Sequence, residues 1–174
     1  MIVLGISPGL RALSYCVLAY HQGATLADPI DADVLHGGKS RPGVVFNLAA
    51  HARVHHMILA VVCERNPPML VALGPACDPS EPQEHVDAVK TLIYILAVTA
   101  GATIVDVSDR KALRAALGVS TDRGIRPAVC AGIRGQVQTR DRRILLATAT
   151  ALAGASQRPQ VAPRGGIHAH LGAT

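Results

Sequence analysis

The sequence of 174 residues is nearly free of aromatic side chains: it contains one Phe, three Tyr and no Trp. Its core must therefore be built from Val, Leu, Ile and Ala, and surfaces that stack on nucleic-acid bases must be scarce. Charged residues are also few, at 17% against 49% hydrophobic, which excludes a disordered chain. This length favours one domain with a sizeable core.

Cysteine pairs and long apolar segments are missing as well. The four cysteines lie far apart with no CxxC pair, which argues against a zinc ribbon or a thioredoxin-like redox site and favours reduced, mostly buried thiols. The opening MIVLGISPG has no basic leader, and no apolar stretch reaches the roughly 18 residues that a membrane span needs. We expect a cytoplasmic protein without a membrane segment.

Positive charge is present and is concentrated in one segment. Nine of the 17 Lys and Arg residues fall between Arg110 and Arg143, against two acids there, Asp122 and Asp141. Such a bias favours a polyanionic partner, although a solvated arginine-rich face is the alternative interpretation.

Hydrophobic periodicity predicts an α/β chain whose strands come first. The expected elements are strands at 2–6 and 12–20 that form a hairpin, a third strand near 25–30 or 32–35, a helix at 44–65 that ends at Asn66-Pro67-Pro68, a strand at 69–73, a helix at 84–100, a strand at 102–107, a helix to 117 that is capped by Ser108, and helices at 127–138 and 140–153. Residues 155–174, rich in Gly, Pro and Ala, are expected to form a flexible tail.

The segment LGISPGLRALSYCVL at Leu4–Leu18 resembles the opening of RuvC-type Holliday junction resolvases, which carry an LGIDPGxxxxGYGVI-like segment. The order of helices and strands up to about residue 154 is similar to that family too. The resemblance implies an RNase H-like mixed sheet flanked by helices, in a single domain over residues 1–154 that precedes the tail.

At the positions that match the family's four metal-binding carboxylates, most of the acids are lost. Ser7 replaces the aspartate at the end of the first strand, Leu73 or Gly74 replaces the glutamate, and Asp141 and Ile144 stand at the aspartate pair. One acid and a hydroxyl make a poor cage for magnesium or manganese. We therefore expect no intact catalytic residue, no bound metal and no other cofactor.

Displaced acids keep a second interpretation open. Asp78, Glu81 and Glu84 lie just beyond the lost glutamate, and Asp106 ends a strand that can adjoin the site. Turns, a helix N-terminus and a strand end explain these acids without a metal. If they assemble a site instead, the chain is a divergent, structure-specific endodeoxyribonuclease that uses magnesium or manganese.

Three other patterns favour structural interpretations. His51 and His55, with His56 beside them, have a helical spacing that suits zinc, but no third ligand is identifiable. Gly37-Gly38-Lys39-Ser40 resembles the end of a phosphate-binding loop without its first glycine, and no second phosphate motif supports an actin-like ATPase. Ser7 matches GxSxG in letters, but a strand follows it where a nucleophile elbow requires a helix.

These observations and the resemblance together predict a catalytically inactive RuvC-like protein of DNA recombination or repair. It is expected to bind DNA, in particular branched DNA of the Holliday junction type, as a homodimer that forms through the apolar helix at 84–100. A protein-interaction scaffold without nucleic-acid function stays an alternative. The side chains expected at DNA phosphates are Arg110, Lys111, Arg114, Arg123, Arg126, Arg134, Arg140, Arg142 and Arg143.

Overall fold

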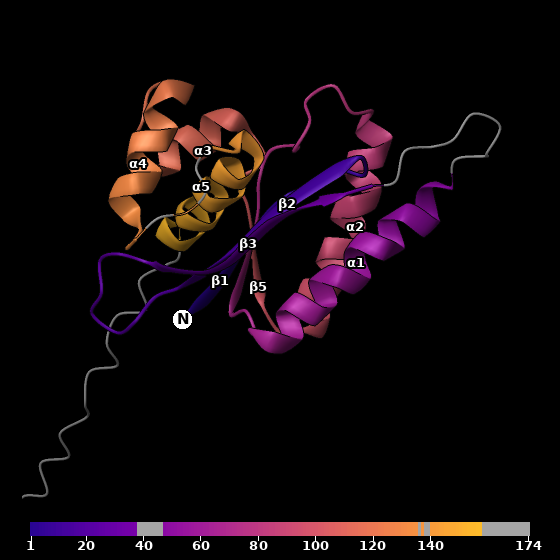
Figure 1. The fold of residues 1–174 in the computed structure, drawn as a ribbon, viewed down its shortest axis with the longest axis horizontal. Helices are drawn as coiled ribbons and strands as arrows, with labels where there is room; N and C mark the ends of the chain where they lie inside the picture. Colours follow the sequence, from indigo (N-terminus) through magenta and orange to yellow (C-terminus); the bar gives the residue numbers. More distant parts are fainter. Residues whose placement is uncertain (38–46, 136, 138–139, 158–174) are drawn as a thin grey trace, which may run out of the picture.

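The computed structural model describes residues 1–37, 47–135, 137 and 140–157. They form one five-stranded sheet with helices on both faces (Figure 1). In chain order the elements are β1 (Ile2–Ser7), β2 (Ala12–Ala19), β3 (Asp28–His36), α1 (Leu48–Arg65), β4 (Leu70–Leu73), α2 (Gln83–Thr99), β5 (Thr103–Asp106), α3 (Arg110–Ala116), the 3-10 helix η1 (Asp122–Gly124), α4 (Ile125–Gly132) and α5 (Arg142–Ser156).

The sheet has the strand order β3-β2-β1-β4-β5 and is mixed. β1 and β2 form an antiparallel hairpin in which Ser7 lies opposite Ser14, and β3 pairs antiparallel with β2. β4 pairs parallel with β1, and β5 pairs parallel with β4. The parallel neighbours require crossover connections, which α1 and α2 provide.

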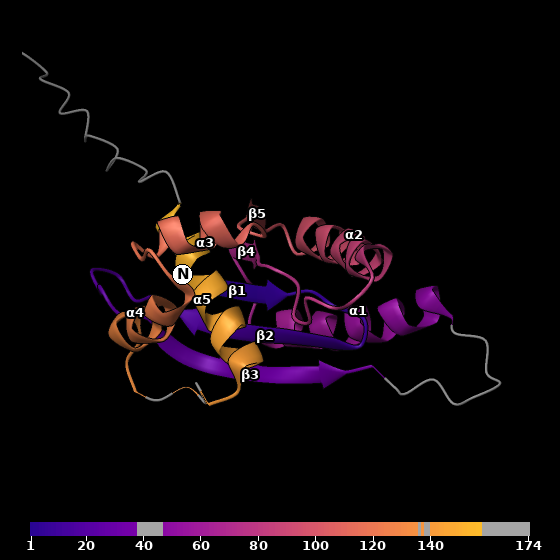
Figure 2. The same cartoon turned by 90° about the horizontal axis from the view of Figure 1, so that it is seen from above.

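Two helical layers cover the sheet, and they pack on it differently (Figures 1 and 2). α1 and α2 cover one face, where large side chains of the sheet and the helices pack together, among them Leu4 and Ile6 of β1 and Ile93 of α2. α5 lies directly on β1, β2 and β4 on the other face, with α3 and α4 beside it. At Gly5 an added Cβ would collide with the Ala147 carbonyl oxygen and lie 2.7 Å from the Ala151 Cβ, so only glycine permits this close approach.

Most of the expected elements are confirmed, and several boundaries differ. The third strand is a single strand, β3, that contains the whole candidate segment 32–35 and the second half of the candidate segment 25–30. α1 begins at Leu48 because Asn47 is extended and its side chain accepts the N–H of Ala50, while residues 44–46 lie outside the described residues.

Two further differences fall in the basic segment. Asp109, not Ser108, caps α3, because its carboxylate accepts the N–H groups of Lys111 and Ala112. The expected helix at 127–138 is shorter and begins earlier, as α4, because the chain after Gly132 extends to form a bridge with Ala27.

The expected tail lies outside the described residues from residue 158 onward, and so does most of the Gly37-Gly38-Lys39-Ser40 segment. α5 continues to Ser156, two residues past the expected end of the domain. All four cysteines are free thiols, and Cys130 is exposed whereas the other three are buried. Among the described helices, none combines the length and the hydropathy needed to cross a bilayer.

Candidate functional site

The end of β1 is a closed, weakly polar position under α5. Ser7 is 0% exposed, and its Oγ has no hydrogen-bond partner among the described residues. Opposite it, the Ser14 hydroxyl donates to the Arg143 carbonyl oxygen at 2.9 Å, and the Cys77 thiol donates to Ser14 Oγ at 3.7 Å. The groups at this position are therefore neutral, whereas the resemblance implies a metal-binding aspartate here.

The two positions considered for the lost glutamate point to opposite faces of the sheet. Leu73 packs with Ile6 and Ile93 beneath α1 and α2. Gly74 donates its N–H to the Ile6 carbonyl oxygen at 2.7 Å and faces α5, where an added Cβ would collide with the Thr150 hydroxyl. Gly74 is therefore the residue on the face of Ser7, and Thr150 fills the space that a longer side chain would need.

At the start of α5, Asp141 is fully engaged by its own helix. Its carboxylate accepts the backbone N–H of Arg143 at 2.8 Å and the Arg143 guanidinium at 2.8 Å and 3.1 Å. The hydrogen bond from the Arg143 side chain holds the pKa of Asp141 below its usual value. Ile144, at the second aspartate position, is buried against Ala12 and Cys77.

The residues at this position do not fit the magnesium or manganese ions of the resembling family. They offer one carboxylate that is already neutralised by an arginine, one hydroxyl and no second acid. Hard divalent cations need several oxygen ligands, usually with carboxylate charge among them. Within the described part of the chain, no three His, Cys, Asp or Glu side chains come together as a metal-binding group.

The displaced acids do not converge on Ser7 either. Asp78 accepts the N–H and the hydroxyl of Ser80 at 2.9 Å and 2.8 Å in its own turn. Asp106 lies on β5, at the sheet edge and separated from β1 by β4, and accepts the Ser108 N–H at 2.8 Å. Glu84 is exposed in the first turn of α2.

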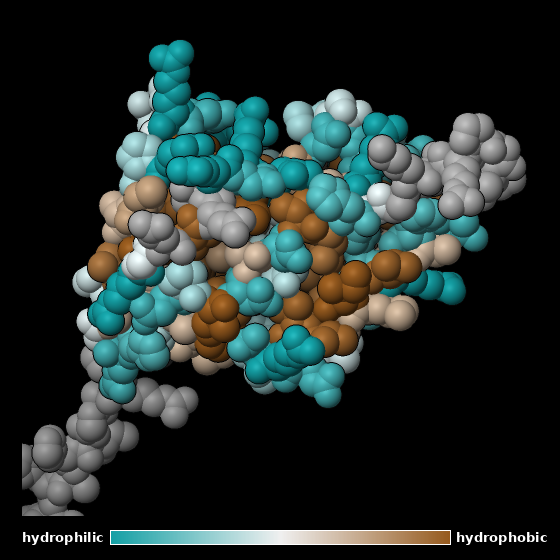
Figure 3. Space-filling model, in the orientation of Figure 1, coloured by the Kyte–Doolittle hydropathy of each residue, from teal (hydrophilic) through white to brown (hydrophobic). Residues whose placement is uncertain are grey.

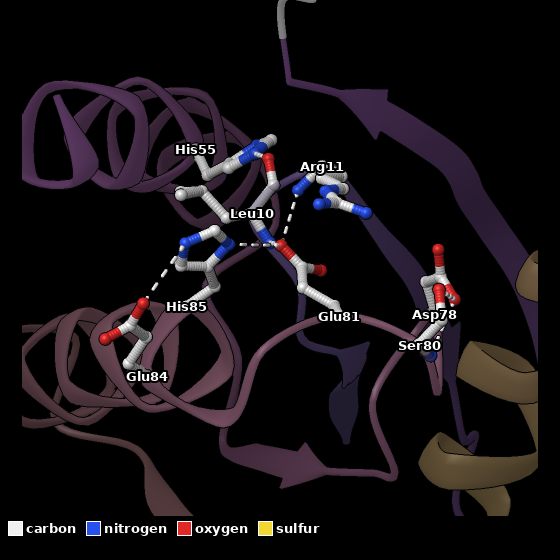
Figure 4. A network of polar contacts seen from close by, with 8 residues as sticks. All are labelled: Leu10, Arg11, His55, Asp78, Ser80, Glu81, Glu84 and His85. Atoms are coloured by element: carbon white, nitrogen blue, oxygen red, sulfur yellow. Dashed lines mark hydrogen bonds and ion pairs between the residues drawn. The ribbon is translucent and has the colours of Figure 1, made fainter. Parts of the chain in front are cut away.

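Glu81, the remaining displaced acid, is a buried clamp on the β1–β2 turn (Figure 4). Its Oε1 accepts the N–H groups of Leu10 and Arg11 at 2.7 Å and 2.8 Å. His85 Nδ1 lies 3.5 Å from the same oxygen. Sequence reasoning missed this role, because no local pattern joins a turn to an acid 70 residues away.

Two of the closely spaced histidines of α1, His51 and His55, contact backbone carbonyl oxygens, as expected for histidines with a structural role. His55 is buried and its Nε2 donates to the Leu10 carbonyl oxygen at 2.9 Å, so it holds the same turn as Glu81. Burial lowers the pKa of His55. His51 Nδ1 lies 3.0 Å from the Asn47 carbonyl oxygen, at the start of the same helix.

All nine basic side chains expected at DNA belong to one layer, which we call the basic layer. It comprises α3, η1, α4, the described residues between α4 and α5, and the first turn of α5. Arg110 and Arg114 pair with Asp122 at 3.0 Å and 3.2 Å, and Arg143 pairs with Asp141. The other six are exposed: Lys111, Arg123, Arg126, Arg134, Arg140 and Arg142. Hydrophilic side chains gather over α3 and α4 (Figure 3).

The layer on the opposite face exposes hydrophobic side chains instead (Figure 3). On α1 they recur at helical spacing and form what we call the apolar stripe: Val54, Met57, Ile58 and Val61, each between 40% and 65% exposed. On α2 Tyr94, Ile95 and Val98 are also exposed, up to 75%. Contiguous exposed apolar surface of this kind is typical of an interaction site.

Comparison with known proteins supports the fold through solved structures. RuvC of Thermus thermophilus is similar with a TM-score of 0.73 and 21% identity, over 90% of this chain and 94% of that chain. A structure of T. thermophilus RuvC in complex with Holliday junction substrate has a TM-score of 0.72 and 20% identity, over 90% and 94% of the two chains.

A more distant likeness is to the Fowlpox virus resolvase in complex with substrate Holliday junction DNA, at a TM-score of 0.50 and 13% identity over 90% and 95% of the two chains. No protein-family model and no curated protein sequence matches the chain. The predicted RuvC-like fold is confirmed, since it is shared over nine-tenths of the chain.

Proposed function

We propose that this chain binds branched DNA of the four-way junction type and does not cleave it. One observation carries the proposal: a fold shared with junction resolvases keeps an arginine-rich layer, but Ser7, Gly74 and Ile144 occupy the metal-site positions. Two of the similar structures are resolvases in complex with Holliday junction substrate, which favours the same class of DNA for this fold.

Binding is supported by the distribution of charge. Lys and Arg side chains that contact phosphates release condensed counterions, so the affinity should fall steeply as salt rises. The exposed basic side chains of the basic layer are available for such contacts. The same layer lacks aromatic side chains, so we expect contacts to the DNA backbone and little opening of base pairs.

Loss of cleavage is supported by the chemistry of the donor set. Hydrolysis of a phosphodiester by two metal ions needs ligands that place an activated water and a stabilised leaving oxygen. The Asp141 carboxylate is held by Arg143, and Ile144 is apolar and buried. The chain therefore retains the means to hold DNA and not the means to hydrolyse it.

A homodimer through the α1–α2 layer completes the proposal. A two-fold interface joins the same patch of both copies, and the apolar stripe with the exposed side chains of α2 offers a surface that can match itself. Because the basic layer lies on the opposite face of the sheet, such a dimer leaves both basic layers uncovered for the arms of a junction.

The test compares a labelled four-way junction with a linear duplex of the same sequence, in EDTA and at two salt concentrations, by fluorescence anisotropy. We expect at least ten-fold tighter binding to the junction and a two-chain complex by light scattering. Equal affinity for both DNAs would contradict the preference for branched DNA. Absence of binding to either DNA at low salt would overturn the nucleic-acid function and leave the scaffold alternative.

A further inference from the structure

A pocket of about 210 Å³ opens at the start of α5, beside the closed end of β1. Ala12 of β2 and Cys77 contribute to its wall. The Cys77 thiol donates a hydrogen bond to Ser14, the residue opposite Ser7 in the β1–β2 pair. We call it the arginine pocket, because three arginines line it: Arg110, Arg142 and Arg143.

We propose that the arginine pocket binds a DNA backbone phosphate directly on guanidinium groups, beside the position where the fold family holds metal ions. This inference rests on the proposed function and deepens it by naming the atom group that the pocket recognises. It also accounts for the arginines that stand next to the lost carboxylates.

Two of the three guanidiniums are held in place. Arg143 is fixed through its Nε and Nη2 by Asp141, and Arg110 is fixed through Nη1 by Asp122. A guanidinium has five N–H donors, so each retains donors for a further acceptor. Arg142 makes no ion pair with any described residue, and it lies in the first turn of α5, where the helix dipole favours an anion.

The charge around the pocket distinguishes an anion from a cation. Asp78 is the single carboxylate among the described lining residues. Hydrogen bonds from Ser80 hold the pKa of Asp78 below its usual value, with a smaller electrostatic contribution from Arg11. The charged residues of the pocket and their ion-pair partners are four arginines and three aspartates, an excess of one positive charge. A phosphodiester carries one negative charge and would neutralise this excess, whereas Mg²⁺ would add to it. These charged residues are Arg110, Arg114, Arg142, Arg143, Asp78, Asp122 and Asp141.

The first test measures junction affinity for Arg142→Gln against Arg53→Gln, a matched change on exposed α1 in the other layer. We expect Arg142→Gln to weaken binding at least five-fold and to reduce the salt slope by about 0.9 for one lost phosphate contact, whereas Arg53→Gln stays within two-fold. Asp78→Asn, which keeps an acceptor for Ser80, should tighten binding at least two-fold.

If Arg142→Gln binds as tightly as Arg53→Gln while the wild type still prefers the junction, the phosphate pocket is wrong and the proposed function stands. A second measurement tests the pocket even if the protein does not bind the junction. The whole protein is titrated with TpT, a dinucleotide with one phosphodiester, and the arginine side-chain N–H groups are followed by NMR. We expect saturable shifts in the wild type that Arg142→Gln weakens, even if the junction does not bind. Absence of saturable shifts would overturn the pocket.

Discussion

The layer of α1 and α2 packs on the sheet through leucine, isoleucine and valine, whereas α5 packs on the opposite face through glycine, alanine and threonine. The surfaces that the two layers turn to solvent also differ. The first layer exposes the apolar stripe, and the second exposes arginine. Close packing under α5 leaves little space at the end of β1, so the interaction chemistry of this layer lies on its outer surface and at the helix start.

This contrast separates the two proposed interactions by face. A partner made of protein suits the apolar stripe, because burial of apolar surface drives association. A partner made of phosphates suits the basic layer. Substitutions in one layer should therefore affect one interaction and leave the other intact.

The largest expected effect is on the close contact between β1 and α5. Gly5→Val should reduce the free energy of unfolding by about 3 kcal/mol or more, because the new side chain meets the backbone of Ala147 and Ala151 and overpacks the core. Denaturant unfolding measures the loss. Ala115→Val, a change at an exposed position of α3, should alter stability by less than about 1 kcal/mol. Equal losses in the two variants would contradict the difference in packing.

The next largest effect is on the clamp below the β1–β2 turn. Glu81→Ala leaves the buried N–H of Leu10 and the neighbouring N–H of Arg11 without their acceptor, which should cost about 2–3 kcal/mol. Glu84→Ala, an exposed neighbour, should cost less than about 0.5 kcal/mol. If thermal unfolding gives the same midpoint for both variants, Glu81 does not hold the turn.

Self-association tests the separation of the two faces. Met57→Asp with Val61→Asp should weaken the homodimer at least thirty-fold, about 2 kcal/mol, because two charges enter an apolar interface. Sedimentation of the variant and of Glu64→Ala, an exposed control on the same helix, measures the effect. Dimers of unchanged affinity would show that the apolar stripe is not the interface.

The smallest expected effect is a pH dependence that comes from His55. Burial lowers its pKa in the folded state, so the unfolded chain binds the proton more readily and stability falls as pH drops below about 6.5. Glu81 opposes this shift and His51 adds to it. Between pH 7.5 and 5.5 the wild type should lose about 1 kcal/mol more than His55→Gln, measured by denaturant unfolding. Parallel pH profiles would contradict this assignment.

The sequence predicted most of the fold because its signals are local. Asn66-Pro67-Pro68 ends a helix for steric reasons, and the turn at Ser7-Pro8-Gly9 predicts the hairpin that the structure contains. The cap of α3 is Asp109, one residue after the predicted Ser108, because both residue types are good caps and the local pattern does not choose between them.

The arrangement of the candidate site was less predictable, because it depends on contacts between distant segments. Leu73 and Gly74 were equivalent in sequence, and only the register with β1 shows that Gly74 shares the face of Ser7. The pairing of Glu81 with the turn at Leu10 and the meeting of Arg110 with Arg142 in one pocket also require the folded chain.

The most direct test of the account is to incubate the protein with a labelled four-way junction in Mg²⁺ or Mn²⁺ and to follow binding and nicking in the same samples. The account predicts a junction complex whose DNA strands stay intact over hours. Paired, metal-dependent nicks that disappear in Asp141→Asn would contradict it, because they would show that the chain assembles a metal site around its remaining carboxylate.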